Sequence, residues 1–205
     1  MKVLILNGSP HDAGNTAAVL QEMTRIFEAE GIETETVQIG DKVIRGCMGC
    51  GACYKIKKCA YDDIVNELAL KFEEADGMVI GTPVYYAAAN STLTACLDRL
   101  FYSTRFDKRM KVGASVAVAR RGGLSSTFDQ LNKYFTISEM PVASSCYWNA
   151  VHGSIPGEAE QDAEGMRVVR TLARNMVFLM KSIKLGKDAY GLPEREPKAW
   201  TNFIR

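Results

Sequence analysis

Short apolar runs alternate with longer amphipathic segments along most of the chain. Residues 3–6 are all apolar, as expected for a strand that is buried on both faces of a parallel sheet. Residues 16–30 carry apolar side chains at steps of three and four, which predicts a helix that stops at Gly31. The same alternation predicts strands over 34–39, 78–80, 111–119 and 141–147, and helices over 62–75, 91–103, 124–138 and 158–187.

Strands that alternate with helices predict an α/β fold with a doubly wound parallel sheet, because parallel strands need crossover connections. We expect one domain over residues 1–190, interrupted by a cysteine-rich insert at 46–60. Residues 191–205 are expected to form a C-terminal arm. The sequence contains no internal repeat and no linker that would divide it further.

The charge balance excludes several classes of protein. The 205 residues include 25 Lys and Arg against 24 Asp and Glu, a formal net charge of +1. A near-neutral chain lacks the basic surface of a nucleic-acid binder and the polybasic tract of a membrane anchor. No apolar stretch approaches the roughly 20 residues of a membrane span, and the first residues lack a signal-peptide pattern. We therefore expect a cytoplasmic protein without nucleic-acid or membrane partners.

The loop after the first strand carries the residue types of a phosphate site. Ser9, Asn15 and Thr16 offer side-chain donors, and Gly14 allows close approach or a positive φ. A loop that enters a helix at the carboxyl edge of a parallel sheet also presents free backbone N–H groups. The loop matches neither the Walker A pattern nor the dinucleotide fingerprint, so a mononucleotide phosphate is favoured. The alternative is an ordinary strand–helix turn with Asn15 or Thr16 as the N-cap.

Two further loops are expected at the same edge. The strand at 78–80 leads into Thr82, Pro83, Val84, Tyr85 and Tyr86, which could lie against a flat ring. The strand at 111–119 leads into Arg120, Arg121, Gly122 and Gly123, which could face the same ring or an anionic ligand. Alternatively, the tyrosines only cover the sheet edge and the arginines are solvated.

With these three loops, the chain resembles the NADPH-dependent FMN reductase branch of the flavodoxin-like superfamily. The matching stretches are Asn7-Gly8-Ser9-Pro10, Gly14-Asn15-Thr16, Thr82 to Tyr86, and Leu93 through Leu97-Asp98-Arg99. The resemblance covers roughly residues 1–185. It implies five parallel strands in the order 2-1-3-4-5, with FMN bound at their carboxyl edge.

The resemblance also implies roles for the loop residues. The phosphate would be held by Ser9, His11, Asn15 and Thr16, the ring would lie along Pro83 to Tyr86, and the 120–123 loop would flank it. The expected cofactor-binding residues are therefore Ser9, His11, Gly14, Asn15, Thr16, Thr82, Pro83, Val84, Tyr85, Tyr86, Arg120, Arg121, Gly122 and Gly123. No catalytic residue is expected, because FMN carries the chemistry. The family further implies NAD(P)H as co-substrate and a homodimer or homotetramer.

The cysteine-rich insert has the spacing Cys47-x2-Cys50-x2-Cys53-x5-Cys59. Zinc sites more often use two C-x2-C pairs that are separated by a longer stretch, whereas consecutive x2 spacings resemble the ferredoxin run that wraps an iron–sulfur cluster. Gly46, Gly49 and Gly51 would help that wrapping. Ala60 stands where a ferredoxin has proline. The insert resembles that of the iron–sulfur flavoproteins, which implies a 4Fe–4S cluster on the four cysteines. A zinc site, or free thiols, remain alternatives.

Together these features predict an FMN-dependent NAD(P)H oxidoreductase. Hydride would pass from NAD(P)H to FMN and on to a quinone, a flavin or a redox protein, with the adjacent cluster relaying single electrons. The alternatives are a cluster-free NAD(P)H:FMN or quinone reductase, a flavodoxin-like electron carrier without turnover, and a zinc-stapled binding module. A carrier is disfavoured by the neutral charge, because such proteins use acidic surfaces to dock basic partners.

Overall fold

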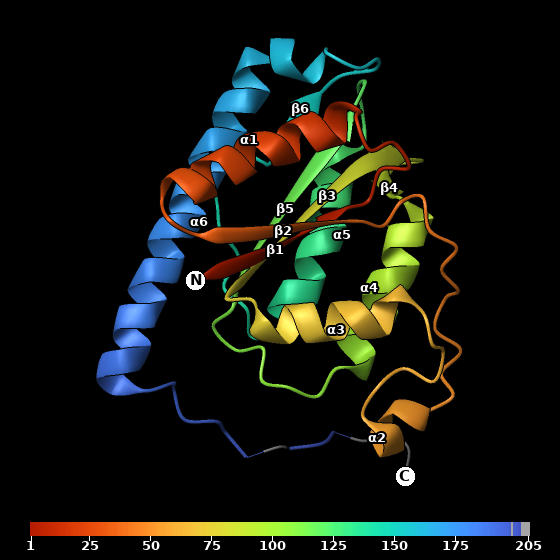
Figure 1. Cartoon of the computed structure of the whole chain (residues 1–205), viewed down its shortest axis with the longest axis vertical. Coiled ribbons are helices and arrows are strands. Elements are labelled where there is room, and N and C mark those ends of the chain that lie inside the picture. The colour runs from red at the N-terminus through yellow and green to blue at the C-terminus, as the bar shows by residue number, and fades with distance from the viewer. Residues whose placement is uncertain (198, 202–205) are drawn as a thin grey trace.

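The centre of the molecule is a parallel β-sheet, shown in Figure 1. The computed structural model describes residues 1–197 and 199–201. The strands are β1 (Lys2–Asn7), β2 (Glu33–Gln38), β3 (Gly77–Tyr85), β5 (Val112–Ala119) and β6 (Ala150–His152), and they pair in the order β2-β1-β3-β5-β6. The short strand β4 (Ala88–Ala89) pairs with β3 in an antiparallel hairpin. Counting the five parallel strands alone, the predicted order 2-1-3-4-5 is confirmed.

Helices cover both faces of the sheet, as the sequence predicts (Figure 1). One face packs against α1 (Asn15–Ala29) and α6 (Ala163–Tyr190), and the other against α3 (Ile64–Glu74), α4 (Ser91–Ser103) and α5 (Leu124–Thr136). The alternation of side chains along β1 explains the two cores. Val3 and Ile5 join the core beneath α1 and α6, whereas Leu4 and Leu6 join the opposite core. An all-apolar run is therefore what this central strand requires.

The fifth strand lies at a different place from the one predicted. Of residues 141–147, only Val142 makes a β-bridge, to Gly113, and the paired strand is β6. Asn149 accounts for the shift. Its side chain is almost fully buried and donates to the backbone oxygen of Ser115 in β5 at 3.0 Å, so a side chain takes the place of a backbone donor and regular strand pairing begins only at Ala150. The expectation of a strand over 141–147 is thus wrong in its bounds.

The segment between β2 and α3 follows a long path outside the sheet. In Figure 1 it leaves the end of β2 and descends beside α4 to the short helix α2 (Ala52–Ile56). This helix, and the 3-10 turn Ala159–Gln161 before α6, were not predicted. Within the described residues, no helix has the length and apolar character that crossing a membrane requires.

The predicted arm begins after α6, which ends at Tyr190. Arg109 donates to the backbone oxygen of Pro193 at 2.9 Å, and Arg195 pairs with Asp107 at 2.9 Å. Residues 198 and 202–205 of the arm lie outside the described residues. The division into a domain over 1–190 and an arm over 191–205 stays a prediction.

Candidate functional site

A pocket of about 640 Å³ opens at the carboxyl edge of the sheet. This volume falls in the range of small-molecule and cofactor sites. The structure brings together residues of all three predicted loops around it, namely Ser9, His11, Gly14, Asn15, Thr16, Pro83, Val84, Tyr85 and Arg120. Residues 153–156, which follow β6, form a fourth wall that the sequence did not indicate.

Five predicted cofactor residues lie outside this lining: Thr82, Tyr86, Arg121, Gly122 and Gly123. The hydroxyl of the buried Thr82 accepts a hydrogen bond from the backbone of Asn90 at 3.1 Å and thereby supports the start of α4. Tyr86 is fully exposed at the tip of the β3–β4 hairpin. Gly123 precedes α5 with a φ of 87°. Contact between these residues and a cofactor stays a prediction.

The start of α1 is left open toward the pocket. Its N-cap is Gly14, and no side chain of the described part of the chain caps the helix, so neither Asn15 nor Thr16 plays that role. By contrast, side chains cap α3, α4 and α6. Gly14 has a φ of −93°, so it does not use the positive φ that glycine allows. The uncapped N–H groups of the first turn are available to an anion.

Asn15 joins two walls of the pocket. Its side-chain oxygen accepts the backbone N–H of Ala159 at 3.1 Å. A Cβ on Gly153 would lie 2.8 Å from the side-chain nitrogen of Asn15, so the loop after β6 passes close to this residue. No sequence motif indicates that this loop lies at the pocket. Ala159, which follows the loop, contacts Asn15 from 144 positions further along the chain.

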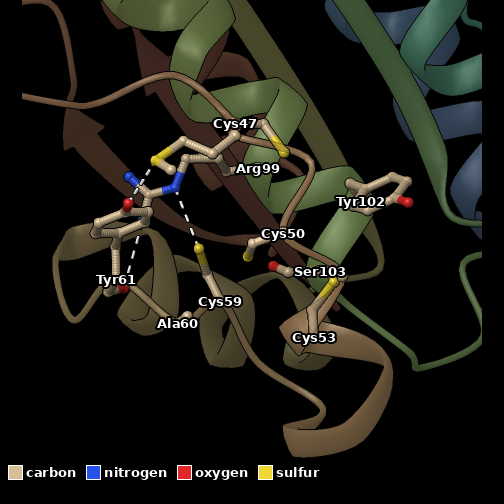
Figure 2. A pocket seen from close by; sticks show the side chains of 11 residues that line it. Cys47, Cys50, Cys53, Cys59, Ala60, Tyr61, Arg99, Tyr102 and Ser103 are labelled. Carbon is tan, nitrogen blue, oxygen red and sulfur yellow. Dashed lines mark hydrogen bonds between the residues drawn. The ribbon is translucent and has the colours of Figure 1, made fainter.

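The cysteine segment forms a second, smaller pocket. Cys47, Cys50, Cys53 and Cys59 all line it, together with residues of α4 (Figure 2). In Figure 2 the sulfurs of Cys50 and Cys59 face each other, while Cys47 and Cys53 border the same space. Gly49 and Gly51 flank Cys50 with φ values of 64° and 67°, a conformation that favours glycine. The positive φ values at these two positions therefore account for glycine on either side of Cys50, while the wrapping of a cluster stays a prediction.

Two side chains that the site prediction omitted hold Cys59. Asn66 of α3 accepts the backbone N–H of Cys59 at 3.0 Å and donates to its oxygen at 3.2 Å. Arg99 of α4 donates from Nε to the Sγ of Cys59 at 3.2 Å. Only Arg99 had a sequence signal, since it belongs to the matching stretch 93–99.

The four cysteines offer the donor type that both an iron–sulfur cluster and a zinc ion use. They line one pocket. Among the described residues, no three Cys, His, Asp or Glu side chains stand close enough together to hold one metal ion.

The sheet order, the open helix start and the pocket at the carboxyl edge define a flavodoxin-like mononucleotide-binding protein. The chain belongs to the NADPH-dependent FMN reductase family, whose model matches residues 1–154. An iron–sulfur flavoprotein of Methanocaldococcus jannaschii is 35% identical over 192 residues, covering 90% of this chain and 100% of the relative. One of Methanosarcina thermophila is 30% identical over 193 residues, covering 92% and 100%. This chain is a flavin oxidoreductase.

Solved structures show the same fold. An NAD(P)H:quinone oxidoreductase from Methanothermobacter marburgensis has a TM-score of 0.68 at 16% identity, covering 86% of this chain and 96% of that one. RosB, solved with a bound riboflavin phosphate derivative, has a TM-score of 0.69 at 17% identity, covering 100% and 92%. At these identities the likeness concerns the fold alone.

Proposed function

We propose that this protein takes hydride from NAD(P)H onto FMN and passes the electrons to a quinone, a flavin or a redox protein. We propose further that a 4Fe–4S cluster on Cys47, Cys50, Cys53 and Cys59 relays them singly. The observation that carries this proposal is that one chain has an uncapped helix start at a pocket of about 640 Å³ and a separate pocket lined by four cysteines.

Residues that line the pocket of about 640 Å³ would hold FMN. The backbone N–H groups at the start of α1, with the hydroxyls of Ser9 and Thr16, suit the phosphate. Pro83 to Tyr85 and Arg120 line the part of the pocket where the ring would lie. The chemistry that bound FMN supplies is two-electron uptake from NAD(P)H and release of those electrons. We assign no catalytic residue, because the protein contributes binding and orientation.

The cluster would be held by the four thiols that line the smaller pocket. Cys53 is buried on α2, and Cys59 is fixed by Asn66 and Arg99. The chemistry that a 4Fe–4S cluster supplies is one-electron transfer. All six cysteines of the chain are free thiols, which suits both the cluster and the cytoplasmic location that we propose.

The flavin assignment is tested by comparing two ligands. We expect the double variant Asn15→Ala, Thr16→Ala to bind FMN about 10 to 100 times more weakly, because it loses hydrogen bonds to a charged group. Riboflavin lacks the phosphate, so its affinity should change far less. Both affinities can be measured by fluorescence titration. If FMN and riboflavin weaken equally, the phosphate does not lie at the start of α1.

The cluster is tested by metal and sulfide analysis after anaerobic purification. We expect about four iron and four sulfide per chain, with the broad visible absorption of a cluster beneath the flavin bands. Near-zero iron with bound FMN would identify a cluster-free reductase. Stoichiometric zinc in a colourless protein would identify a zinc-stapled module and refute the redox role.

We also propose that the protein acts as a homodimer or homotetramer. Tyr85 lines the pocket and is exposed, its neighbour Tyr86 is fully exposed, and Phe178 and Leu185 are exposed on α6. Large apolar side chains that are exposed together commonly mark an interaction surface. Light scattering on a sizing column measures the mass, and a monomer at micromolar concentration would refute this part of the proposal.

A further inference from the structure

Arg99 is the largest fully buried side chain of the described residues, with a relative exposure of only 1%. Arginine is rarely buried to this extent unless every donor has a partner. Figure 2 shows its guanidinium next to Cys59 and Tyr61. The hydrogen bonds of Arg99 therefore show how α4 holds the cysteine segment.

The guanidinium bonds to the chain on both sides of the cysteines. Before the cysteines, Nη1 donates to the backbone oxygen of Arg45 at 3.2 Å. Nε donates to the Sγ of Cys59 at 3.2 Å, and Nη2 donates to the backbone oxygen of Tyr61 at 3.3 Å. One side chain thus ties the beginning and the end of the segment to the same point of α4, which fixes the loop that carries the four thiols.

The same guanidinium also brings a positive charge to the thiols. It forms a two-point ion pair with Asp63, at 2.6 Å to Oδ2 and 2.8 Å to Oδ1. The guanidinium of arginine is effectively always protonated in proteins, and the ion pair with Asp63 favours its charged form, so Arg99 is a cation beside Cys59.

We propose that Arg99 is the positioning residue of the cysteine site, holding the Sγ of Cys59 in place and raising the reduction potential of the cluster bound there. The inference rests on the proposed function, since it assigns a role toward that cluster. When the cluster gains one electron its negative charge increases, and a buried cation at hydrogen-bond distance from a ligating sulfur stabilises that state. Asp63 reduces this effect, because it offsets the charge of Arg99 from the other side.

The two partners predict potential changes of opposite sign. Arg99→Gln keeps hydrogen-bond donors but removes the cation, so we expect the fraction of reduced cluster at a fixed potential to fall. Asp63→Asn leaves the cation without its counter-charge, so the reduced fraction should rise, and asparagine still serves as the N-cap that Asp63 supplies to Val65. A change of at least tenfold in the reduced-to-oxidised ratio, about 59 mV for one electron, is expected for Arg99→Gln.

The experiment is a redox titration of the anaerobically purified holoprotein, with the reduced cluster followed by electron paramagnetic resonance. Arg99→Lys retains the charge but loses the planar set of donors that contacts Cys59, Asp63 and the backbone. The reduction potential of the cluster in this variant should therefore lie nearer to wild type, while the iron content of the variant falls. Arg109→Lys is the matched control, because Arg109 forms a comparable ion pair with Asp107 away from the cysteines. Its cluster should be unchanged. Equal potentials in Arg99→Gln, Asp63→Asn and wild type would overturn the electrostatic part.

A measurement on the metal-free protein separates this inference from the proposed function. By hydrogen exchange, Arg99→Gln and Arg99→Lys should each speed amide exchange in residues 45–61 at least tenfold, whereas Arg109→Lys should not. Unchanged exchange in this segment would overturn the positioning role even if the wild-type protein carries a cluster. Conversely, faster exchange in a protein that never binds iron would support the positioning role and refute the cluster.

Discussion

The shape of the phosphate loop depends on residues that do not line the pocket. The side chain of Asn7 accepts the backbone N–H of Ser9 at 3.0 Å, and the side chain of Gln38 donates to the backbone oxygen of Ser9. Gly40 lies directly against the loop, since a Cβ there would be 2.2 Å from the carbonyl carbon of Ser9. The end of β2 therefore supports the loop from beneath, and only glycine fits at position 40.

This contact predicts that Gly40→Ala weakens FMN binding without touching the pocket. The new methyl group must push the backbone at Ser9 outward, which should cost about 1–3 kcal/mol of stability and displace the loop. Thermal unfolding and FMN titration measure the two effects. Gly186→Ala is the control, because nothing lies within 4 Å of the Cβ it would add to α6. An unchanged FMN affinity in Gly40→Ala would show that the loop tolerates the displacement.

The tip of the β3–β4 hairpin stores strain at two residues. Tyr86 and Ala87 have φ values of 49° and 59°, and they form the two-residue turn between the paired Tyr85 and Ala88. Such a turn favours Asn-Gly, because both positions need a positive φ. We expect Tyr86→Asn with Ala87→Gly to raise the free energy of unfolding by about 1 kcal/mol.

Urea denaturation measures this gain. Ile137→Asn is a suitable control, because this exposed residue has a φ of −67° and should gain nothing. If the turn variant is no more stable than wild type, contacts of the native side chains outweigh the backbone strain.

At the scale of elements, the central strands could be predicted because they are apolar on both faces, and the helices because each buries one clear face. The pattern failed where a single polar contact decides the path, as at Asn149, whose bond to Ser115 displaces the last strand. It also missed α2, which is only five residues long and lies between left-handed residues at Gly51 and Lys57. Hydrophobic periodicity carries no signal for such a helix.

Sequence reasoning was also better for the local parts of the candidate sites than for the distant ones. It grouped the residues of the first loop, which line one pocket, and the four cysteines, which line another, because each set comes from a short stretch of chain. Their binding of a phosphate and of a cluster stays a prediction. Arg99, by contrast, contacts Cys59 from 40 positions away, through the packing of α4, and the resemblance marked this residue without indicating the contact. Asn66 lies only seven positions after Cys59, but a single asparagine on a helix has no pattern that would indicate such a contact.

The start of α6 gives a prediction about this element. Asp162 accepts the backbone N–H of Gly165 at 2.9 Å as the N-cap, and that of His152 at 2.7 Å, so it joins α6 to the end of β6. We expect Asp162→Ala to cost about 1–2 kcal/mol of stability at neutral pH. Asp188→Ala, which removes an exposed partner of Lys184, should cost little.

The pH dependence of this effect has a definite sign. Burial tends to raise the pKa of Asp162, but the hydrogen bonds from Gly165 and His152 outweigh it, and the net pKa lies below the ordinary 3.8. Its stabilising effect is therefore complete above pH 3.8 and is lost as the pH falls through the lowered pKa. Denaturant titrations should show the gap between wild type and Asp162→Ala closing in acid. A gap that stays constant would mean that ionisation of Asp162 is irrelevant.

At the scale of the whole molecule, the two candidate sites lie at different places along α4. The helix begins at Ser91, next to the β3–β4 hairpin at the flavin pocket. Arg99, which contacts Cys59, lies roughly 12 Å further along the helix at 1.5 Å per residue. None of the described residues lines both pockets. The chain between them, residues 39–46, begins where Gly40 packs against the phosphate loop.

This separation predicts that the two sites bind their cofactors independently. Cys50→Ser should abolish or sharply reduce iron content, yet leave FMN affinity within about twofold, because effects at distant sites without shared partners are close to additive. The double variant Asn15→Ala, Thr16→Ala should in turn lose FMN affinity and keep its iron. Iron analysis and FMN titration on the same anaerobic preparations test both directions.

Since coupling between binding sites is reciprocal, both experiments must agree. A tenfold loss of FMN affinity in Cys50→Ser would show that order in the cysteine segment reaches the phosphate loop through residues 39–46, and that the two sites act as one unit.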